Sequence, residues 1–403
     1  MQLPEDFVRE TRQLMGEERF SRFMEAFHED APVSIRLNPL KIRNEKQHST
    51  LNKVPWCEEG YYLEGRPQFT FDPLFHAGCY YVQEAASMFV THILREVIKN
   101  EELRIKSDSL SVLDMCAAPG GKSTAIRTVL PEGSTLVNNE PIPTRAQILL
   151  ENITKWGWSD CIVTNNYPRD FRKAKAKFDI ILCDVPCSGE GMFRKDPNAI
   201  SEWSLQNVEK CWRLQREIVA DAWECLKSGG ILIYSTCTYN IKENEENVRW
   251  ILDTYEAEPV VIPTEPLWNI TGSLLPDFDA PVYRFIPGFT RSEGLFICAL
   301  RKEIKNEELR MKNSSLKILT PNLPEGNFPH VDLPYSEALQ YLRGEALVLP
   351  SDTPRGIVTV TYKGFPLGPM KNIGNRANNL YPKPWRIKTT YLPTEEIKII
   401  DIQ

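Results

Sequence analysis

The sequence has no pattern of a membrane or exported protein. No hydrophobic run approaches the ~18 residues that a transmembrane helix requires. The N-terminal stretch MQLPEDFVRETRQLMGEERF is charged throughout and contains no signal-peptide core. Both absences predict a cytoplasmic protein that does not contact a membrane.

Metal-ligand spacing is also absent. The ten cysteines include no C-x-x-C pair, and the five histidines are scattered far from them. Because structural zinc sites need closely spaced cysteine and histidine ligands, we expect no metal centre. In a large chain without a signal sequence, cysteines are more typical of reduced thiols than of disulfides.

The composition is that of a globular protein with an uneven charge distribution. With 403 residues, 42% of them hydrophobic, the chain can form two or three domains. Averaged over the whole chain, the net charge of −6 disfavours nucleic-acid binding. Residues 353–388, however, contain seven Lys and Arg residues, four aromatic residues and no Asp or Glu. This pattern favours a nucleic-acid contact surface, although a solvated basic face over core aromatics would have the same composition.

Hydrophobic periodicity predicts three regions. Residues 5–27 have the spacing of one or two amphipathic helices, and the following APVSIRLNPLK predicts a short strand. Residues 80–98, YYVQEAASMFVTHILREVI, predict a helix. From residue 111, strand patterns alternate with helical patterns, which indicates a doubly wound, mostly parallel sheet. The segments YRFIPG and GLFICALRK predict an antiparallel finish to this sheet.

One charged segment occurs twice. IKNEELRIKSDSL at 98–110 recurs as IKNEELRMKNSSL at 304–316, and nothing between the copies repeats. We interpret both copies as solvated linkers on either side of the α/β region. The sequence therefore predicts an N-terminal α+β domain (1–78), an α/β domain (79–303), a charged linker (304–320) and a C-terminal domain (321–403).

A glycine-rich loop follows the first strand of the α/β region. CAAPGGKST, residues 116–124, comes directly after the apolar SVLDM. A strand, a Gly-rich turn and a helix in this order are typical of nucleotide and nucleoside sites. The loop differs from the phosphate-binding G-x-x-x-x-G-K-[ST] by Cys116 in place of the first glycine, and Pro119 removes a backbone N–H. A P-loop ATPase and a nucleoside-cofactor enzyme are the two interpretations.

Three further strand ends carry polar or reactive residues, at the edge where doubly wound sheets bind ligands. Glu140 ends TLVNNE, 19 residues after Gly121, at the spacing of an acid that binds a ribose diol. A surface glutamate capping the next helix would fit the same pattern. Asp184 and Cys187 follow in DVPCSGEG, and Cys237 lies in STCTY after the strand ILIY. Because reactive thiolates belong on such loops, we expect nucleophilic cysteines here.

The chain resembles the NOP/Sun (Fmu) family of S-adenosylmethionine-dependent RNA cytosine-5 methyltransferases. The matching motifs are PVSIRLNP, YYVQEAASM, LDMCAAPGGKS, DVPCSGEGMFRKDP and LKSGGILIYSTCTYN followed by ENEENV, over about residues 30–300. GIVTVTYKGFPLGPMKNIGNRANNLYPKPWRI resembles the C-terminal region of the bacterial RsmF-like branch. The resemblance implies a Rossmann-like S-adenosylmethionine-dependent methyltransferase domain and a C-terminal RNA-binding domain. It implies a monomeric enzyme that modifies rRNA, free or within a ribosomal subunit, with tRNA as the alternative.

The resemblance also implies roles for individual residues. Cys237 would attack C6 of an unstacked cytosine and so make C5 reactive, and Cys187 would help remove the C5 proton and release the enzyme. Asp184 would stabilise the protonated N3 edge, and Lys122 would support the same charge network. No metal is implied. The S-adenosylmethionine contacts would be Cys116, Ala117, Ala118, Pro119, Gly120, Gly121, Lys122, Glu140 and Asp184.

One position departs from the pattern of the family. Relatives often carry an acid near the adenine at the third strand end, where this chain has VTNNYPRDF, so Asn165 or Asn166 would replace it as a neutral group. Two alternatives come from other functional classes. A P-loop ATPase leaves the PCSG and STC loops unexplained, and a non-catalytic ribosome-assembly factor leaves both cysteines without a function.

Overall fold

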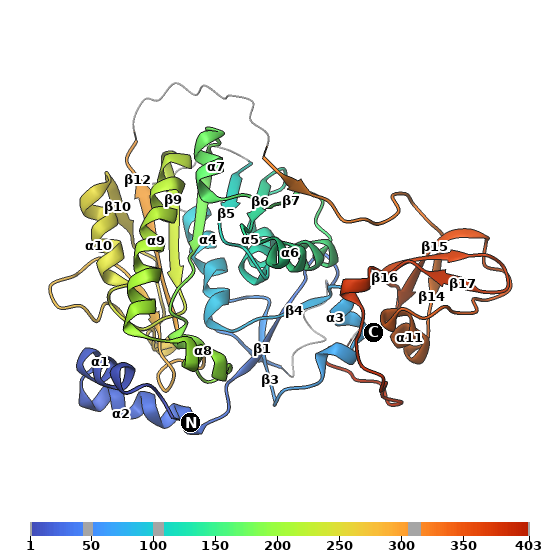
Figure 1. Ribbon diagram of the computed structural model, residues 1–403, viewed down its shortest axis with the longest axis horizontal. Helices are drawn as coiled ribbons and strands as arrows, with labels where there is room; N and C mark the ends of the chain where they lie inside the picture. Colours follow the sequence, from blue (N-terminus) through green and yellow to red (C-terminus); the bar gives the residue numbers. More distant parts are fainter. Residues whose placement is uncertain (1, 43–50, 100–108, 305–315, 402–403) are drawn as a thin grey trace.

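The computed structural model describes residues 2–42, 51–99, 109–304 and 316–401, and within them a nine-stranded sheet forms the centre (Figure 1). Five parallel strands form the middle of this sheet, and antiparallel strands extend both edges. The predicted doubly wound, mostly parallel sheet with its antiparallel finish is thereby confirmed. The order is β10 (Ala257–Val260), β12 (Leu295–Lys302), β9 (Leu226–Thr236), β8 (Phe178–Asp184), β5 (Ser111–Asp114), β6 (Thr135–Asn139), β7 (Cys161–Thr164) and β13 (Ile318–Leu319), with β11 (Tyr283–Phe285) paired to β12.

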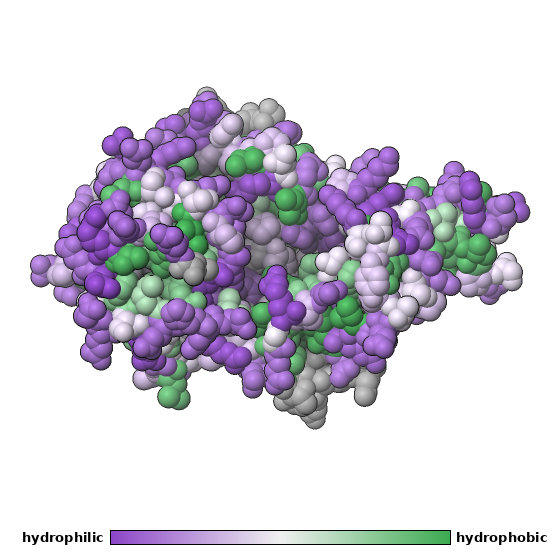
Figure 2. Space-filling model, turned by 60° about the horizontal axis from the view of Figure 1, so that its bottom comes forward, coloured by the Kyte–Doolittle hydropathy of each residue, from purple (hydrophilic) through white to green (hydrophobic). Residues whose placement is uncertain are grey.

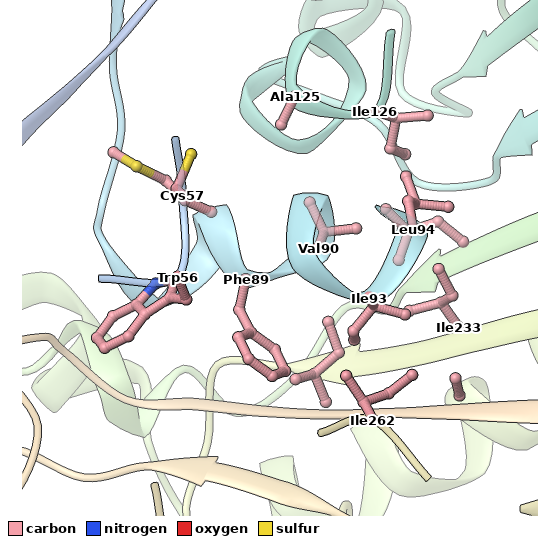
Figure 3. Packing of buried hydrophobic residues seen from close by; sticks show 14 of the residues in the cluster. Trp56, Cys57, Phe89, Val90, Ile93, Leu94, Ala125, Ile126, Ile233 and Ile262 are labelled. Carbon is pink, nitrogen blue, oxygen red and sulfur yellow. The ribbon is translucent and has the colours of Figure 1, made fainter. Parts of the chain in front are cut away.

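Helices cover both faces of the sheet, because successive strand residues point to opposite sides. Ile180 and Leu182 of β8 pack in the core that holds α4 (Phe89–Lys99) and α5 (Gly121–Val129). Figure 3 shows Ile93 and Leu94 of α4 between the sheet and α5. The opposite face packs against α7, α9 and α10. The other helices of this region are α6 (Pro143–Trp156), α7 (Pro168–Lys173), α8 (Pro197–Glu202), α9 (Leu205–Cys225) and α10 (Glu245–Thr254).

The N-terminal residues form two helices and a small antiparallel sheet. α1 (Glu5–Met15) and α2 (Glu17–Glu25) confirm the predicted amphipathic helices, and their aromatic side chains pack in one cluster with Phe193, Trp203 and Tyr239. The sheet contains the predicted strand as β1. Its order is β2 (Asn52–Lys53), β3 (Gly60–Leu63), β1 (Val33–Leu37) and β4 (Tyr80–Val82).

The helix predicted over residues 80–98 is correct only in its second half. β4 forms from the first residues, because two tyrosines and a valine favour strand geometry and pair with β1. The Glu84 carboxylate then accepts hydrogen bonds from the backbone N–H groups of Ala86 (3.0 Å) and Ser87 (3.1 Å), which starts the helical turn before α4. β4 also places residues after position 78, the predicted end of the N-terminal domain, in the N-terminal sheet.

The C-terminal residues form a second small sheet with one helix. Its strands are ordered β14 (His330–Asp332), β15 (Gly356–Tyr362), β16 (Phe365–Asn372) and β17 (Ala377–Asn379), and α11 (Tyr335–Arg343) precedes β15. Figure 1 shows this sheet at one end of the molecule, on the side of α3 (Pro73–His76).

The N-terminal sheet and the C-terminal region share one hydrophobic core. Ile35 of β1 and Tyr80 of β4 belong to the same buried cluster as Leu339 of α11 and Val358 of β15. The Tyr335 hydroxyl also donates a hydrogen bond to the carbonyl of Phe71, at 3.0 Å. Deletion of the C-terminal residues would therefore expose apolar surface of the N-terminal sheet, because the side chains of β1 and β4 pack in one cluster with those of α11 and β15.

The predicted linker at 304–320 ends in a strand of the central sheet. Ile318 and Leu319 form β13, which pairs antiparallel with β7. Most of both copies of the repeated charged segment, residues 100–108 and 305–315, lies outside the described residues. The interpretation of these copies as solvated linkers stays a prediction.

The surface is mainly polar on the face shown in Figure 2, where hydrophobic residues appear in separate groups. In the part of the chain that the structure describes, no helix has the length and apolar character needed to cross a membrane.

Candidate active site

A cavity of about 580 Å³ lies at the carboxyl ends of β5, β8 and β9. This is the edge at which doubly wound sheets bind their ligands. It brings together most of the residues that the sequence singles out, but neither Gly120 nor Glu140 lines it. The predicted site residues in its wall are Cys116, Ala117, Ala118, Pro119, Gly121, Lys122, Asp184, Cys187 and Cys237.

The loop between β5 and α5 forms a tight turn against the neighbouring strand. The Ala117 N–H donates a hydrogen bond to the Asn139 carbonyl at the end of β6, at 2.8 Å. Gly120 has a φ of +113°, a left-handed conformation that favours glycine. A Cβ on Gly121 would lie 3.4 Å from the Tyr81 ring, so the N-terminal sheet packs directly beside the start of α5.

Asp114, at the end of β5, is a buried acid in the cavity wall that the site prediction did not include. It is 1% exposed and accepts a hydrogen bond from Ser123 Oγ at 2.7 Å on Oδ2. Among the described atoms, Oδ1 is buried without a hydrogen-bond partner. Burial raises the pKa of Asp114 to about 7. The unpartnered oxygen beside the glycine loop fits a cofactor that offers hydrogen-bond donors.

Glu140 follows β6 and is 1% exposed, so it is not a surface residue. Its Oε1 accepts a hydrogen bond from the Ile142 N–H at 3.0 Å, and Arg145 Nη1 lies 3.5 Å from Oε2, which has no hydrogen-bond partner in the described atoms. Arg145 lines the cavity and donates a hydrogen bond to the Ala118 carbonyl at 2.9 Å. Glu140 is therefore linked to the glycine loop through Arg145, although it lies behind the cavity wall.

Glu140→Ala is expected to weaken S-adenosylmethionine binding by about 1–3 kcal/mol, the cost of a lost buried hydrogen bond. Isothermal titration of the cofactor measures this change, with thermal unfolding as a check on folding. Glu132→Ala, at an exposed glutamate after α5, is the matched control. An unchanged dissociation constant would show that Glu140 has no part in the cofactor site.

Lys122 and Asp184 form an ion pair across the cavity. Lys122 Nζ lies 2.9 Å from Asp184 Oδ2, and Ser235 Oγ donates a hydrogen bond to Asp184 Oδ1 at 2.6 Å. Burial alone would lower the pKa of Lys122, but the Asp184 carboxylate outweighs it and the net shift is upward. The Lys122 side chain, which extends from α5, is thus held as a cation beside Asp184 at the end of β8.

The two predicted cysteines lie side by side. Cys187 follows β8 and Cys237 follows β9, and because these strands are parallel neighbours their ends meet. The two Sγ atoms are 3.2 Å apart, and the Cys237 N–H points at Cys187 Sγ at 3.4 Å. The hydrogen bond with Cys237, followed by burial, raises the pKa of the Cys187 thiol well above its usual value. The two thiols therefore share one hydrogen bond, and the raised pKa favours the protonated form of Cys187.

The approach of the loops depends on Gly191. Its N–H donates a hydrogen bond to the Cys237 carbonyl at 2.8 Å. A Cβ at this position would lie 2.7 Å from the Gly294 carbonyl oxygen and 2.9 Å from that of Cys237. Only glycine fits here, so the segment after Cys187 packs directly on the backbone of Cys237.

Sequence reasoning missed the part of the wall that comes from the N-terminal sheet and from the start of β12. Gln83 and Glu84 follow β4, and Glu293 precedes β12. The motif YYVQEAASM contains the first two, but its helical periodicity gave no reason to place them at a sheet edge. Arg145 is missed for a similar reason, since it lies inside α6 rather than at a strand end.

Asn165 and Asn166 lie beside the cavity wall and not in it. Asn165 Nδ2 donates a hydrogen bond to the Glu140 carbonyl at 2.8 Å. The Asn166 amide pairs with the backbone of Lys317, donating to its carbonyl at 3.2 Å and accepting from its N–H at 3.0 Å. Both side chains are therefore hydrogen-bonded to backbone groups. A contact of Asn165 or Asn166 with the adenine of the cofactor stays a prediction.

Two solved structures have a similar fold. A methyltransferase homolog protein from Pyrococcus horikoshii has a TM-score of 0.59 and 27% identity, covering 74% of this chain and 95% of its own. NSun6 from the same organism, in a crystal structure with SFG, has a TM-score of 0.61 and 22% identity, covering 75% of this chain and 99% of its own. The fold and the site define an S-adenosylmethionine-dependent methyltransferase.

Sequence comparisons identify the family. The chain is 32% identical over 359 residues to the ribosomal RNA small subunit methyltransferase F of Shigella dysenteriae, covering 86% of this chain and 71% of that protein. It is 33% identical over 353 residues to the protein of the same name from Enterobacter sp. strain 638, covering 84% and 69%. Three family models match: 16S rRNA methyltransferase RsmB/F (102–301), the N-terminal domain of 16S rRNA methyltransferase RsmF (3–85) and the methyltransferase RsmF PUA domain (328–387).

The chain belongs to the RsmB/F family of 16S rRNA methyltransferases. This membership confirms the resemblance to the NOP/Sun family, the cofactor and RNA as the class of substrate. It leaves the P-loop ATPase interpretation of CAAPGGKST without support.

Proposed function

We propose that this protein methylates C5 of a cytidine in ribosomal RNA and that Cys237 forms a transient bond to C6 of the base. The observation that carries this proposal is the contact of Cys187 and Cys237, whose sulfur atoms lie 3.2 Å apart in the wall of the cofactor cavity. A methyltransferase that acts at nitrogen or oxygen needs no thiol, whereas carbon at C5 must first be made nucleophilic.

The arrangement supports the following sequence of steps. S-adenosylmethionine supplies an electrophilic methyl group when it is bound. Cys237 Sγ bonds to C6 as the C5–C6 double bond opens, which places electron density on C5. N3 takes a proton from water as C6 is attacked and returns it when the double bond re-forms. Asp184, held by Lys122 and Ser235, accepts a hydrogen bond from this N3–H and stabilises the opened ring. Cys187 then takes the C5 proton of the methylated ring, the double bond re-forms and the Cys237 thiolate leaves.

The sulfur contact allows Cys187 to change its protonation state during this sequence. Its pKa is raised first by the hydrogen bond with Cys237 and second by burial. Once Cys237 Sγ is bonded to carbon it no longer shares a proton with Cys187, so the first cause disappears and the pKa of Cys187 falls. Cys187 then gives up its proton more readily than before the bond formed, and its thiolate is the form that can take the C5 proton.

Ribosomal RNA is the proposed substrate because the relatives that span most of the chain are named for it. The basic C-terminal residues support RNA binding by charge: Lys371, Arg376 and Lys383 are exposed, whereas Tyr362 and Tyr381 are buried in the core. The aromatic residues therefore build this region, and phosphate contacts by the cations would hold the RNA. tRNA and an assembled ribosomal subunit are the two other forms of substrate that the test below distinguishes.

The function is tested by trapping the covalent intermediate. Cys187→Ser is expected to form a slowly migrating, RNase-sensitive band on a denaturing gel after incubation with S-adenosylmethionine and total bacterial RNA. The serine cannot take the C5 proton, so Cys237 stays bonded to the base. Sequencing of the trapped RNA identifies the substrate, and parallel incubations with ribosomal subunits and with tRNA compare the three forms.

The matched control is Cys211→Ser, at a half-buried cysteine on α9 outside the cavity. It should behave as the unmodified protein does and give no stable band. Failure of Cys187→Ser to form any adduct, with an unmodified protein that still methylates RNA, would overturn the covalent mechanism.

A further inference from the structure

The residues that follow the two cysteines belong to one buried polar network. Ser188 Oγ and Thr238 Oγ1 lie 3.0 Å apart, and both side chains are buried. Asn240 Nδ2 donates a hydrogen bond to Thr238 Oγ1 at 3.0 Å and lies 3.4 Å from Ser188 Oγ. The network therefore connects the loop of Cys187 with the loop of Cys237 through the residues that directly follow the two cysteines.

Glu243 joins these two loops. It lies in the loop after Cys237, and its N–H donates a hydrogen bond to Asn240 Oδ1 at 2.9 Å. Its Oε1 accepts from Asn240 Nδ2 at 2.8 Å. Its Oε2 accepts from the backbone N–H of Ser188 at 3.0 Å and from Gln215 Nε2 at 2.6 Å. Because Ser188 is adjacent to Cys187 in the chain, this carboxylate fixes the backbone that carries Cys187.

A second carboxylate, Glu190, lies three residues after Cys187 and also joins the two loops, because Asn240 Nδ2 donates a hydrogen bond to its Oε1 at 3.0 Å. Glu190 Oε2 accepts hydrogen bonds from the N–H groups of Tyr239 (2.7 Å) and Asn240 (3.0 Å). The Cys237 carbonyl is bound by the Gly191 N–H, and Thr236 pairs with Phe296 in the sheet. These contacts hold Cys237 without Glu243 and also fix the Cys187 loop at Glu190 and Gly191, whereas the Ser188 amide next to Cys187 donates its hydrogen bond to Glu243.

The chemistry of this contact requires a carboxylate. Every group that faces the two Glu243 oxygens is a donor: a backbone N–H and two carboxamide NH₂ groups. A glutamine would turn its NH₂ group toward one of these donors, so the hydrogen bonds on that side of the side chain are lost. Burial, followed by the charge of Glu190, raises the pKa of Glu243 to about 7, and the three donors oppose this shift.

We propose that Glu243 is a positioning residue for Cys187: it holds the proton-accepting cysteine against the nucleophile and so sets the rate at which the enzyme leaves its RNA. The inference rests on the proposed cytosine-5 function. If the Ser188 amide moves, Cys187 withdraws from the C5 proton while Cys237 remains able to bond to C6. The step after methyl transfer then slows more than methyl transfer itself.

Glu243→Gln is expected to accumulate the covalent RNA adduct although both cysteines are present. Multiple-turnover methylation should fall about tenfold, the size of one lost charged hydrogen bond, while single-turnover methyl transfer changes by less than about threefold. Radiolabelled methyl transfer measures both rates, and the denaturing gel measures the adduct. A residue that only supported the fold would lower both rates together without any adduct.

The comparison includes Cys187→Ser as the reference for a full trap and Glu246→Gln as the matched control on α10, which should match the unmodified protein. An adduct in Cys187→Ser with none in Glu243→Gln overturns the inference alone. Absence of an adduct in Cys187→Ser overturns the proposed function and this inference with it. If Glu243→Gln does not fold, Glu243→Asp replaces it, because the shorter side chain keeps the charge but withdraws it from Ser188.

Discussion

Cys237→Ala is expected to lower RNA methylation by on the order of 10³-fold or more, because removing a covalent nucleophile removes the reaction path itself. The affinity for S-adenosylmethionine should change by less than about twofold, which is below 1 kcal/mol. Cys237 lies after β9, whereas the glycine loop extends from β5 to α5, so the cofactor keeps its own contacts. Radiolabelled methyl transfer and isothermal titration of the cofactor measure the two quantities.

Cys161→Ala is the control for this comparison, since Cys161 starts β7 and is outside the cavity. Methylation by this variant should remain near that of the unmodified protein. A Cys237→Ala protein that lost cofactor affinity together with activity would show that Cys237 supports the site structurally instead of acting as the nucleophile.

Arg284→Met is expected to reduce the free energy of unfolding by about 3–5 kcal/mol, because it leaves one charge of a buried ion pair without its partner. Arg284 on β11 and Glu245 at the start of α10 are both almost completely buried, and Arg284 Nε donates to Glu245 Oε1 at 2.7 Å. Arg284 also donates a hydrogen bond to the Tyr239 carbonyl at 2.7 Å, so the loop after Cys237 loses a contact as well. Urea unfolding monitored by circular dichroism measures the change.

The double variant Arg284→Met with Glu245→Leu tests the cause of this loss. It removes the charge that the single variant leaves buried, and should recover much of the stability. A double variant that is less stable than either single variant would indicate that shape, and not the unpaired charge, determines the effect.

The sequence predicts the central sheet well because its signals are local. Each strand of the parallel core is a short apolar run between helical patterns, and the carboxyl ends of such strands must meet at one edge. This rule alone brings Lys122, Asp184, Cys187 and Cys237 into one cavity. It cannot give the sulfur–sulfur distance, which depends on the glycine packing at Gly191 and on the buried carboxylates behind the loops.

The elements that the sequence misses depend on partners far along the chain. Residues 80–82 have the periodicity of the helix that follows them, and only pairing with β1 makes them a strand. β13 lies in a segment predicted as a linker and forms because β7 offers a free edge. Gln83 and Glu84 reach the cavity only because the N-terminal sheet packs beside α5.

The core shared by β1, β4, α11 and β15 also constrains the order of folding during synthesis. The N-terminal sheet leaves the ribosome first, but part of its apolar face is covered only by α11 and β15. The hydrogen bond between Tyr335 and Phe71 spans 264 positions of the chain. Such contacts form late because the intervening chain must first be made and compacted. Part of the apolar surface of the nascent N-terminal sheet therefore stays exposed until α11 and β15 have been synthesised.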